Sequence, residues 1–204
     1  MMDEPHERSD ERPGARSGDL EIVPLTPERW PGLESLFGAR GACGGCWCMH
    51  WRLTSREYEA GKGEANRRAL REIVEAGPPP GLLAYANGLT VGWCALGPRE
   101  VFGRLGRSRI LAPVDDRPVW SVVCFFVEKA HRGRGVTVAL LDAAVGYAAE
   151  RGAEVVEGYP VEPKKETTPP VFAFTGLASA FRRAGFEEVA RRSPTRPIMR
   201  CEVC

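Results

Sequence analysis

The sequence predicts one α/β domain built on a mixed β-sheet with helices on both faces. Between residues 119 and 161 an apolar, β-branched run is followed by a glycine-bearing turn, a long helix and another apolar run. This order implies two parallel strands joined by a right-handed crossover. The dipeptide Asn87-Gly88 stands between two apolar runs and predicts a β-hairpin. Two short apolar segments near the end of the chain favour antiparallel pairing, so the sheet is mixed.

The elements follow one another with recognisable start and stop signals. Thr26, Pro27 and Glu28 have the order of an N-cap, a first-turn proline and a first-turn acid. Apolar residues recur at helical spacing over residues 64–76, and Gly77 with three prolines ends that helix. Ser55 is a candidate cap for one further turn, and residues 98–117 suit a long loop with a short helix. We expect strands over residues 20–25, 82–86, 90–96, 118–127, 155–161, 186–190 and 198–201, and helices over residues 26–38, 64–76, 134–151 and 176–184.

Composition bounds the domain organisation and the possible partners. Residues 1–18 are rich in charge, proline and glycine and predict a disordered tail, whereas residues 19–204 suit one domain. The formal net charge of +1 gives no field that would hold nucleic acid or an anionic membrane. No apolar run approaches the ~20 residues of a membrane span, and the first residues lack the apolar core of a signal peptide. We therefore expect a cytoplasmic protein, whose seven cysteines are thiols or metal ligands rather than disulfides.

The turn at residues 131–135, His-Arg-Gly-Arg-Gly, is the strongest functional signal. Unpaired N–H groups and the helix dipole make such a helix N-terminus an anion site, and glycine lets a phosphate approach the backbone closely. A nucleotide P-loop would need Gly-Lys-Ser/Thr after the glycines, and none follows. A dinucleotide fingerprint would need a third glycine where Val138 stands, and would normally lie in the first strand–helix unit.

A third interpretation fits better. Arg132-x-x-Gly135 after Phe-Val-Glu, with a hairpin upstream and Gly185-Phe186 near the end, resembles the GNAT acyltransferase superfamily. The resemblance extends in element order over residues 19–204. It implies a mixed, largely antiparallel sheet of six to seven strands with a central splayed parallel pair. It also implies an N-acetyltransferase, monomer or homodimer, that moves an acyl group from acetyl-CoA or another acyl-CoA to a small-molecule amine.

The resemblance also implies which residues hold the acyl-CoA. The amides of residues 133–138 hold the pyrophosphate, the backbone of residues 125–127 pairs with the pantetheine arm, and two arginines contact phosphates unless they are only solvated. Thr137 stands where the family usually has Gly or Ala, so its methyl group crowds the phosphate or its hydroxyl binds it. The implied cofactor-binding residues are Phe125, Phe126, Val127, Arg132, Gly133, Arg134, Gly135, Val136, Thr137 and Val138.

The catalytic groups are less well defined. Many family members carry a tyrosine five residues before the Phe of the Gly-Phe pair as the acid for the leaving thiolate, and Phe181 occupies that position here. Tyr159, Ser179 and Cys124 are candidate substitutes, each of which also suits an ordinary structural position. Glu157, which shares a strand face with Tyr159, is the candidate base, and Glu128 at the end of the strand is another or a first-turn acid.

A cysteine-rich loop, residues 43–52, allows two interpretations. Cys43-x-x-Cys46 together with Cys201-x-x-Cys204 has the content of a tetrahedral zinc site if the fold brings the pairs together. Alternatively the loop walls the acceptor site, with Trp47 and Trp51 against the acceptor and Arg52 on its carboxylate, or it plugs the sheet edge. His50 in this loop is expected to pack or to face solvent. Two other functions therefore stay open, a non-catalytic acyl-CoA sensor and a zinc-stabilised binding module.

Overall fold

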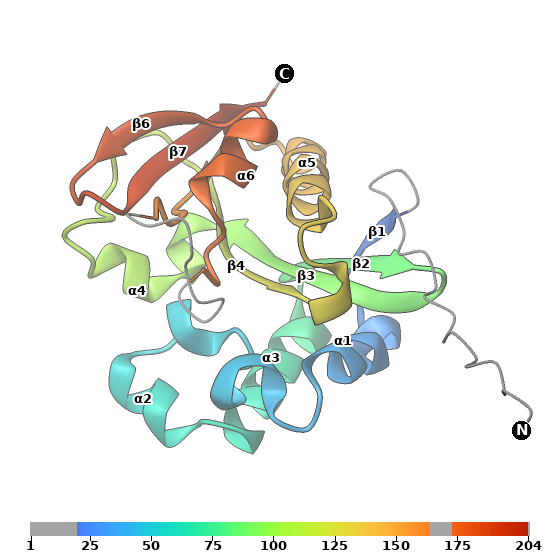
Figure 1. Cartoon of the computed structure of the whole chain (residues 1–204). Helices are drawn as coiled ribbons and strands as arrows, with labels where there is room; N and C mark the ends of the chain where they lie inside the picture. The colour runs from blue at the N-terminus through green and yellow to red at the C-terminus, as the bar shows by residue number, and fades with distance from the viewer. Residues whose placement is uncertain (1–19, 164–172, 204) are drawn as a thin grey trace, which may run out of the picture.

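A seven-stranded sheet organises the chain (Figure 1). The computed structural model describes residues 20–163 and 173–203, so the expected disordered tail lies outside the described residues. The strand order is β1-β2-β3-β4-β5-β7-β6. The strands are β1 (Leu20–Pro24), β2 (Gly81–Ala86), β3 (Leu89–Pro98), β4 (Trp120–Val127), β5 (Val155–Gly158), β6 (Glu187–Arg191) and β7 (Pro197–Glu202).

The expected mixed sheet is confirmed. Strands β1 to β4 pair antiparallel in succession, with the tight turn at Asn87 and Gly88 between β2 and β3. Both turn residues have positive φ angles, 50° and 74°, which is why Asn-Gly favours such a hairpin. The one parallel pair is β4 with β5, and β5–β7 and β7–β6 are antiparallel.

Helices cover both faces of the sheet (Figure 1). Helices α5 and α6 pack on one face, and α1 and α3 lie on the other, each over its own apolar cluster. The helices are α1 (Trp30–Phe37), α2 (Ser55–Ala60), α3 (Glu64–Ala76), α4 (Gly103–Gly106), α5 (Val136–Ala149) and α6 (Ala178–Arg183). Short 3₁₀ turns occupy Pro27–Arg29, Met49–Trp51, Arg99–Val101 and Lys129–His131, and Gly41–Gly45 forms an irregular turn. In the described part of the chain, no helix is both long and apolar enough to cross a membrane.

The cap of α2 differs from the expectation by one residue. Thr54, not Ser55, is the N-cap, because its hydroxyl accepts the Glu57 N–H at 3.3 Å while the Glu57 carboxylate accepts the Thr54 N–H at 2.9 Å. This reciprocal pair is a capping box.

A β-bulge in β4 reorients the second half of that strand. Ala95 of β3 pairs with Cys124 and the next residue pairs with Val122, so Val123 is an extra residue in β4. Val123 and Cys124 consequently both pack in the α1/α3 cluster, whereas Phe125 packs in the α5/α6 cluster. Pairing with β5 ends at Val122. The bulge therefore turns Cys124 toward the face that carries residues 41–51, the cysteine-rich segment between α1 and α2 that is called the 41–51 loop below.

Candidate active site

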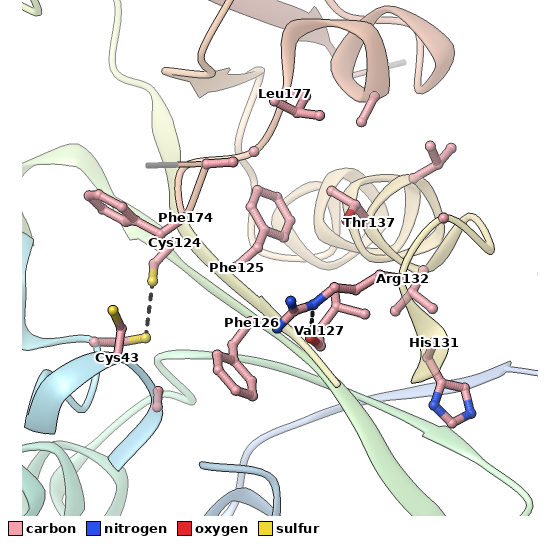
Figure 2. Close-up of a pocket in the computed structure, with 18 of the residues that line it drawn as sticks. Cys43, Cys124, Phe125, Phe126, Val127, His131, Arg132, Thr137, Phe174 and Leu177 are labelled. Atoms are coloured by element: carbon pink, nitrogen blue, oxygen red, sulfur yellow. Dashed lines mark hydrogen bonds between the residues drawn. The ribbon is translucent and has the colours of Figure 1, made fainter. Parts of the chain in front are cut away.

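One pocket of about 750 Å³ lies where β4 leaves its parallel partner (Figure 2). On one side its walls are the 41–51 loop and Tyr58 of α2. The other walls are the end of β4, the turn and first residues of α5, and residues 173–183. This volume is in the range of small-molecule and cofactor sites.

The first wall is the turn that begins α5. Gly133 and Gly135 have φ angles of 74° and 86°, which other residues adopt at a cost. Gly135 is the N-cap, so the N–H groups of Val136, Thr137 and Val138 open α5 without intrahelical acceptors. All but one of the residues expected to hold the phosphates line the pocket; Arg134 does not. The geometry is therefore that of an anion site at a helix N-terminus.

The second wall is the edge of β4 beyond its pairing with β5, formed by Phe125, Phe126 and Val127. Figure 2 shows the Arg132 side chain reaching back to this strand, where its Nε donates to the Val127 carbonyl at 3.0 Å. The Phe125 N–H donates to the Phe174 carbonyl at 2.6 Å. Two positions of the edge are thus occupied by the protein's own groups, and a ligand that pairs with this strand competes with them.

Glu128, the acidic residue that follows β4, stabilises the turn before α5. The Glu128 carboxylate accepts the Ala130 N–H and contacts His131 Nδ1, both at 2.8 Å. The hydrogen bond from His131 holds the pKa of Glu128 below its ordinary value. Glu128 is therefore engaged in local capping rather than free to act as a base.

The third wall carries thiols and aromatic rings. Cys43, Cys46, Cys48 and Cys124 line the pocket, and the Cys48 and Cys124 sulfurs lie 3.1 Å apart. Hydrogen bonding to Cys48 and burial raise the pKa of Cys46, and the contact with Cys124 raises that of Cys48. Both thiols are therefore protonated at neutral pH.

The aromatic part of this wall is uncharged. His50, Trp51, Tyr58 and Phe174 line the pocket, and the His50 ring packs edge-on against each of the other three. Burial, together with the charge of Arg104, lowers the pKa of His50 to about 4. Burial raises the pKa of Tyr58 to about 12. His50 thus packs as expected, but it does so in the wall of the pocket.

The expected catalytic residues separate into two groups. Cys124 and Ser179 line the pocket, whereas Glu157 and Tyr159 do not and are fully buried. Glu157 accepts hydrogen bonds from Arg99 at 2.9 Å and Arg200 at 2.8 Å, and the Tyr159 hydroxyl donates to it at 2.6 Å. This carboxylate is held by two arginines inside the protein, so its geometry supports a structural role.

Phe181 occupies the position of the family tyrosine as a core residue. Its ring is fully buried and packs edge-on against Phe125 and Phe186, with centroids 6.1 and 5.1 Å away. A Cβ placed on Gly158 would meet it at 2.1 Å. The space around Phe181 is therefore filled by apolar groups.

Only one of the three residues expected to bind the acceptor lines the pocket. Trp51 lines the pocket, but Trp47 and Arg52 do not. Trp47 is buried and stacks on Trp30 with ring centroids 5.9 Å apart, and the Arg52 guanidinium lies 4.7 Å from the Phe102 ring centre. Tyr58 and Phe174 were not foreseen as lining residues, because no local motif marks them. Only the pairing of distant segments brings them to the pocket.

The two cysteine pairs do not form a zinc site among the described residues. Cys201 packs against the α5/α6 cluster, whereas Cys43 and Cys46 lie in the pocket wall. No group of three or more His, Cys, Asp or Glu in the described part of the chain is arranged to hold a metal ion. The fourth expected ligand, Cys204, lies outside the described residues.

Comparisons with known proteins agree with this architecture. The sequence profile of the acetyltransferase (GNAT) family matches residues 47–163. A GNAT-family acetyltransferase from Streptococcus agalactiae superimposes with a TM-score of 0.53 at 13% identity, over 91% of this chain and 95% of that one. Ard1 from Thermoplasma volcanium gives 0.50 at 15% identity, over 91% and 99%. A search of curated proteins finds no match. With the profile matching more than half of its length, the chain belongs to the acetyltransferase (GNAT) family.

Proposed function

We propose that this protein transfers an acetyl group, or another acyl group, from acyl-CoA to the nitrogen of a small-molecule amine. One observation carries the proposal: a single pocket joins the anion site at the N-terminus of α5 to an uncharged aromatic and thiol wall. Bound together in such a pocket, a thioester and an amine would react as one complex, which contributes much of the rate. That the protein works in the cytoplasm, as a monomer or homodimer, stays a prediction.

The donor half uses the residues that the family resemblance indicates. The free N–H groups at residues 136–138 would hold the pyrophosphate, with Arg132 beside them, and the Phe125–Val127 edge would pair with the pantetheine arm. Bound acyl-CoA supplies the activated carbonyl and the leaving thiolate. Cys124 and Ser179 are the candidate proton donors to that thiolate, since both line the pocket.

The acceptor half favours an amine in its neutral form. Among the described residues, no Asp or Glu lines the pocket, and the lining arginines, Arg132 and Arg183, belong to the donor side. An apolar wall without a carboxylate disfavours an ammonium ion and lowers the pKa of a bound amine. The rings of Trp51, Tyr58 and Phe174 add flat apolar surface. These features support a weakly basic, ring-bearing amine over a lysine side chain.

The two arginines of the turn give a matched test of the donor half. Arg132→Ala should raise the KM for acetyl-CoA about 10-fold, because a hydrogen bond to a charged group contributes about 1.5–3 kcal/mol. Arg134→Ala should leave it within about two-fold, since Arg134 does not line the pocket. Equal effects of both substitutions would show that only the net charge of the turn matters. Absence of any upward shift in Tm at millimolar acetyl-CoA would refute acyl-CoA binding.

Release of CoA thiol measures the acceptor preference. An arylamine, an alkylamine and a lysine-containing peptide should react in decreasing order of kcat/KM. Faster reaction of the peptide would overturn the small-molecule assignment. Binding of acetyl-CoA without release of thiol for any amine would instead indicate a non-catalytic acyl-CoA sensor, which the buried Phe181 at the family's tyrosine position favours.

A further inference from the structure

Two thiols from distant parts of the chain meet in the pocket. Cys48 and Cys124 are separated by 76 positions in the sequence, and their sulfurs lie 3.1 Å apart. Cys48 belongs to the 41–51 loop and Cys124 to the central strand β4. Both side chains are almost completely buried, yet both contribute to the pocket lining. A small oxidant that enters the pocket therefore reaches a dithiol.

The backbone of the loop is strained where it places Cys48. Trp47 and Cys48 are consecutive non-glycine residues with positive φ angles of 42° and 52°. Residues in this region cost free energy and persist only where the surrounding structure enforces them. The result is that Trp47, Cys48 and Met49, three residues in succession, are all buried.

Further contacts fix the position of the Cys48 sulfur. The indole Nε1 of Trp93, which is fully buried on β3, donates to it at 3.0 Å. On the other side, the β4 bulge turns Cys124 toward the loop. The pair is thus held in contact by the strained loop, an indole and a bulge, each independent of the others.

We propose that Cys48 and Cys124 form a reversible dithiol–disulfide site in the wall of the pocket. With hydrogen peroxide as oxidant, one thiol is converted to a sulfenic acid with release of water. The second thiol then displaces the hydroxyl group from that sulfur, forming the S–S bond and a second water. Two electrons and two thiol protons pass to the peroxide. A dithiol reductant reverses the reaction by thiol–disulfide exchange.

The bond would tie the loop to β4. Its closure would constrain a long segment of the unfolded chain, so the oxidised protein should melt about 5 °C or more above the reduced protein. Its effect on catalysis rests on the proposed function: acceptor turnover should fall while the thermal shift by acetyl-CoA persists, because the anion site lies on another wall. If acetyl-CoA gives no shift in either redox state, the proposed function fails and the dithiol assignment is unaffected.

The test counts thiols and maps the bond. Wild-type protein treated with a small excess of hydrogen peroxide should lose two thiols, and peptide mapping should join the fragment that contains residue 48 to the one that contains residue 124. Dithiothreitol should restore both thiols. The variants Cys48→Ser and Cys124→Ser should not lose a pair of thiols. Cys94 is a buried cysteine on the opposite face of the sheet, so the variant Cys94→Ser should still lose two thiols. A bond that joins other cysteines, such as 43 with 46, or no loss of thiols in the folded wild type would overturn the proposal. The mapping needs no variant, so poor folding of a serine variant does not affect it.

Discussion

Glu157→Gln distinguishes a structural carboxylate from a catalytic one. The Glu157 side chain is 1% exposed, and its two oxygens accept from Arg99 and Arg200, whose side chains are 11% and 6% exposed. Glutamine keeps the shape but removes the charge and turns one N–H donor toward an arginine. Breaking a buried pair in this way costs about 3–5 kcal/mol. Arg200 also pairs with Asp115 at 2.6 Å, so we expect the lower end, about 3 kcal/mol.

The measurement is thermal and urea unfolding together with steady-state kinetics. For a domain of this size about 3 kcal/mol corresponds to a fall in Tm of about 6–12 °C. The KM for acetyl-CoA should stay within about two-fold, because Glu157 lies outside the pocket lining. Glu202→Gln is the matched control, since Glu202 forms an exposed pair with Arg117 and its loss should cost less than about 1 kcal/mol. An unchanged Tm with a kcat reduced about 100-fold would refute this reasoning and make Glu157 a general base.

Four further outcomes are expected. The pKa of His50 is lowered from 6.5 to about 4. As the pH falls from about 6.5 to about 4, the unfolded chain therefore binds a proton at His50 that the folded protein does not bind. Stability should drop there by up to about 3 kcal/mol, and urea unfolding of His50→Gln at several pH values should show a smaller drop; identical slopes would contradict it. Gly146→Ala on the exposed face of α5 should raise Tm by about 2–4 °C, since a Cβ there meets nothing within 4 Å. Gly158→Ala should lower Tm markedly in the same melting assay, because its Cβ would meet Phe181 at 2.1 Å; equal Tm values for the two alanine variants would show that the core relaxes freely. Gly135→Ala, at a φ of 86°, should cost about 1–2 kcal/mol and weaken acetyl-CoA binding, which calorimetry would show; unchanged affinity would mean that the turn does not shape the anion site.

Most elements were predictable because their signals are local. Asn87-Gly88 specifies its own turn, and the apolar spacing of residues 64–76 together with Gly77 sets the ends of α3 as observed. Elements with weaker signals are shorter than expected: α6 spans Ala178–Arg183, and β5 ends at Gly158. There Tyr159-Pro160 interrupts the ladder, since proline has no N–H to donate.

The catalytic candidates show what the sequence pattern leaves undecided. Glu157 and Tyr159 alternate on one strand face as expected, but that face carries Arg99 and Arg200 from segments far along the chain. Periodicity states which side chains share a face and does not state what covers that face. The same holds for Arg52, because Phe102 from the 98–117 segment lies under its guanidinium and Arg52 does not line the pocket.

The sequence by itself determined the order of the elements, the mixed sheet, the hairpin and the glycine turn at the start of α5. The hairpin and the turn depend on the conformational preferences of a few consecutive residues, Asn87-Gly88 in the first and the glycines at 133 and 135 in the second. Only the tertiary structure decided which polar groups reach the pocket. A one-residue bulge in β4 brings Cys124 to Cys48, and distant arginines withdraw Glu157 into the interior. These outcomes depend on contacts between residues many tens of positions apart, which no local pattern encodes.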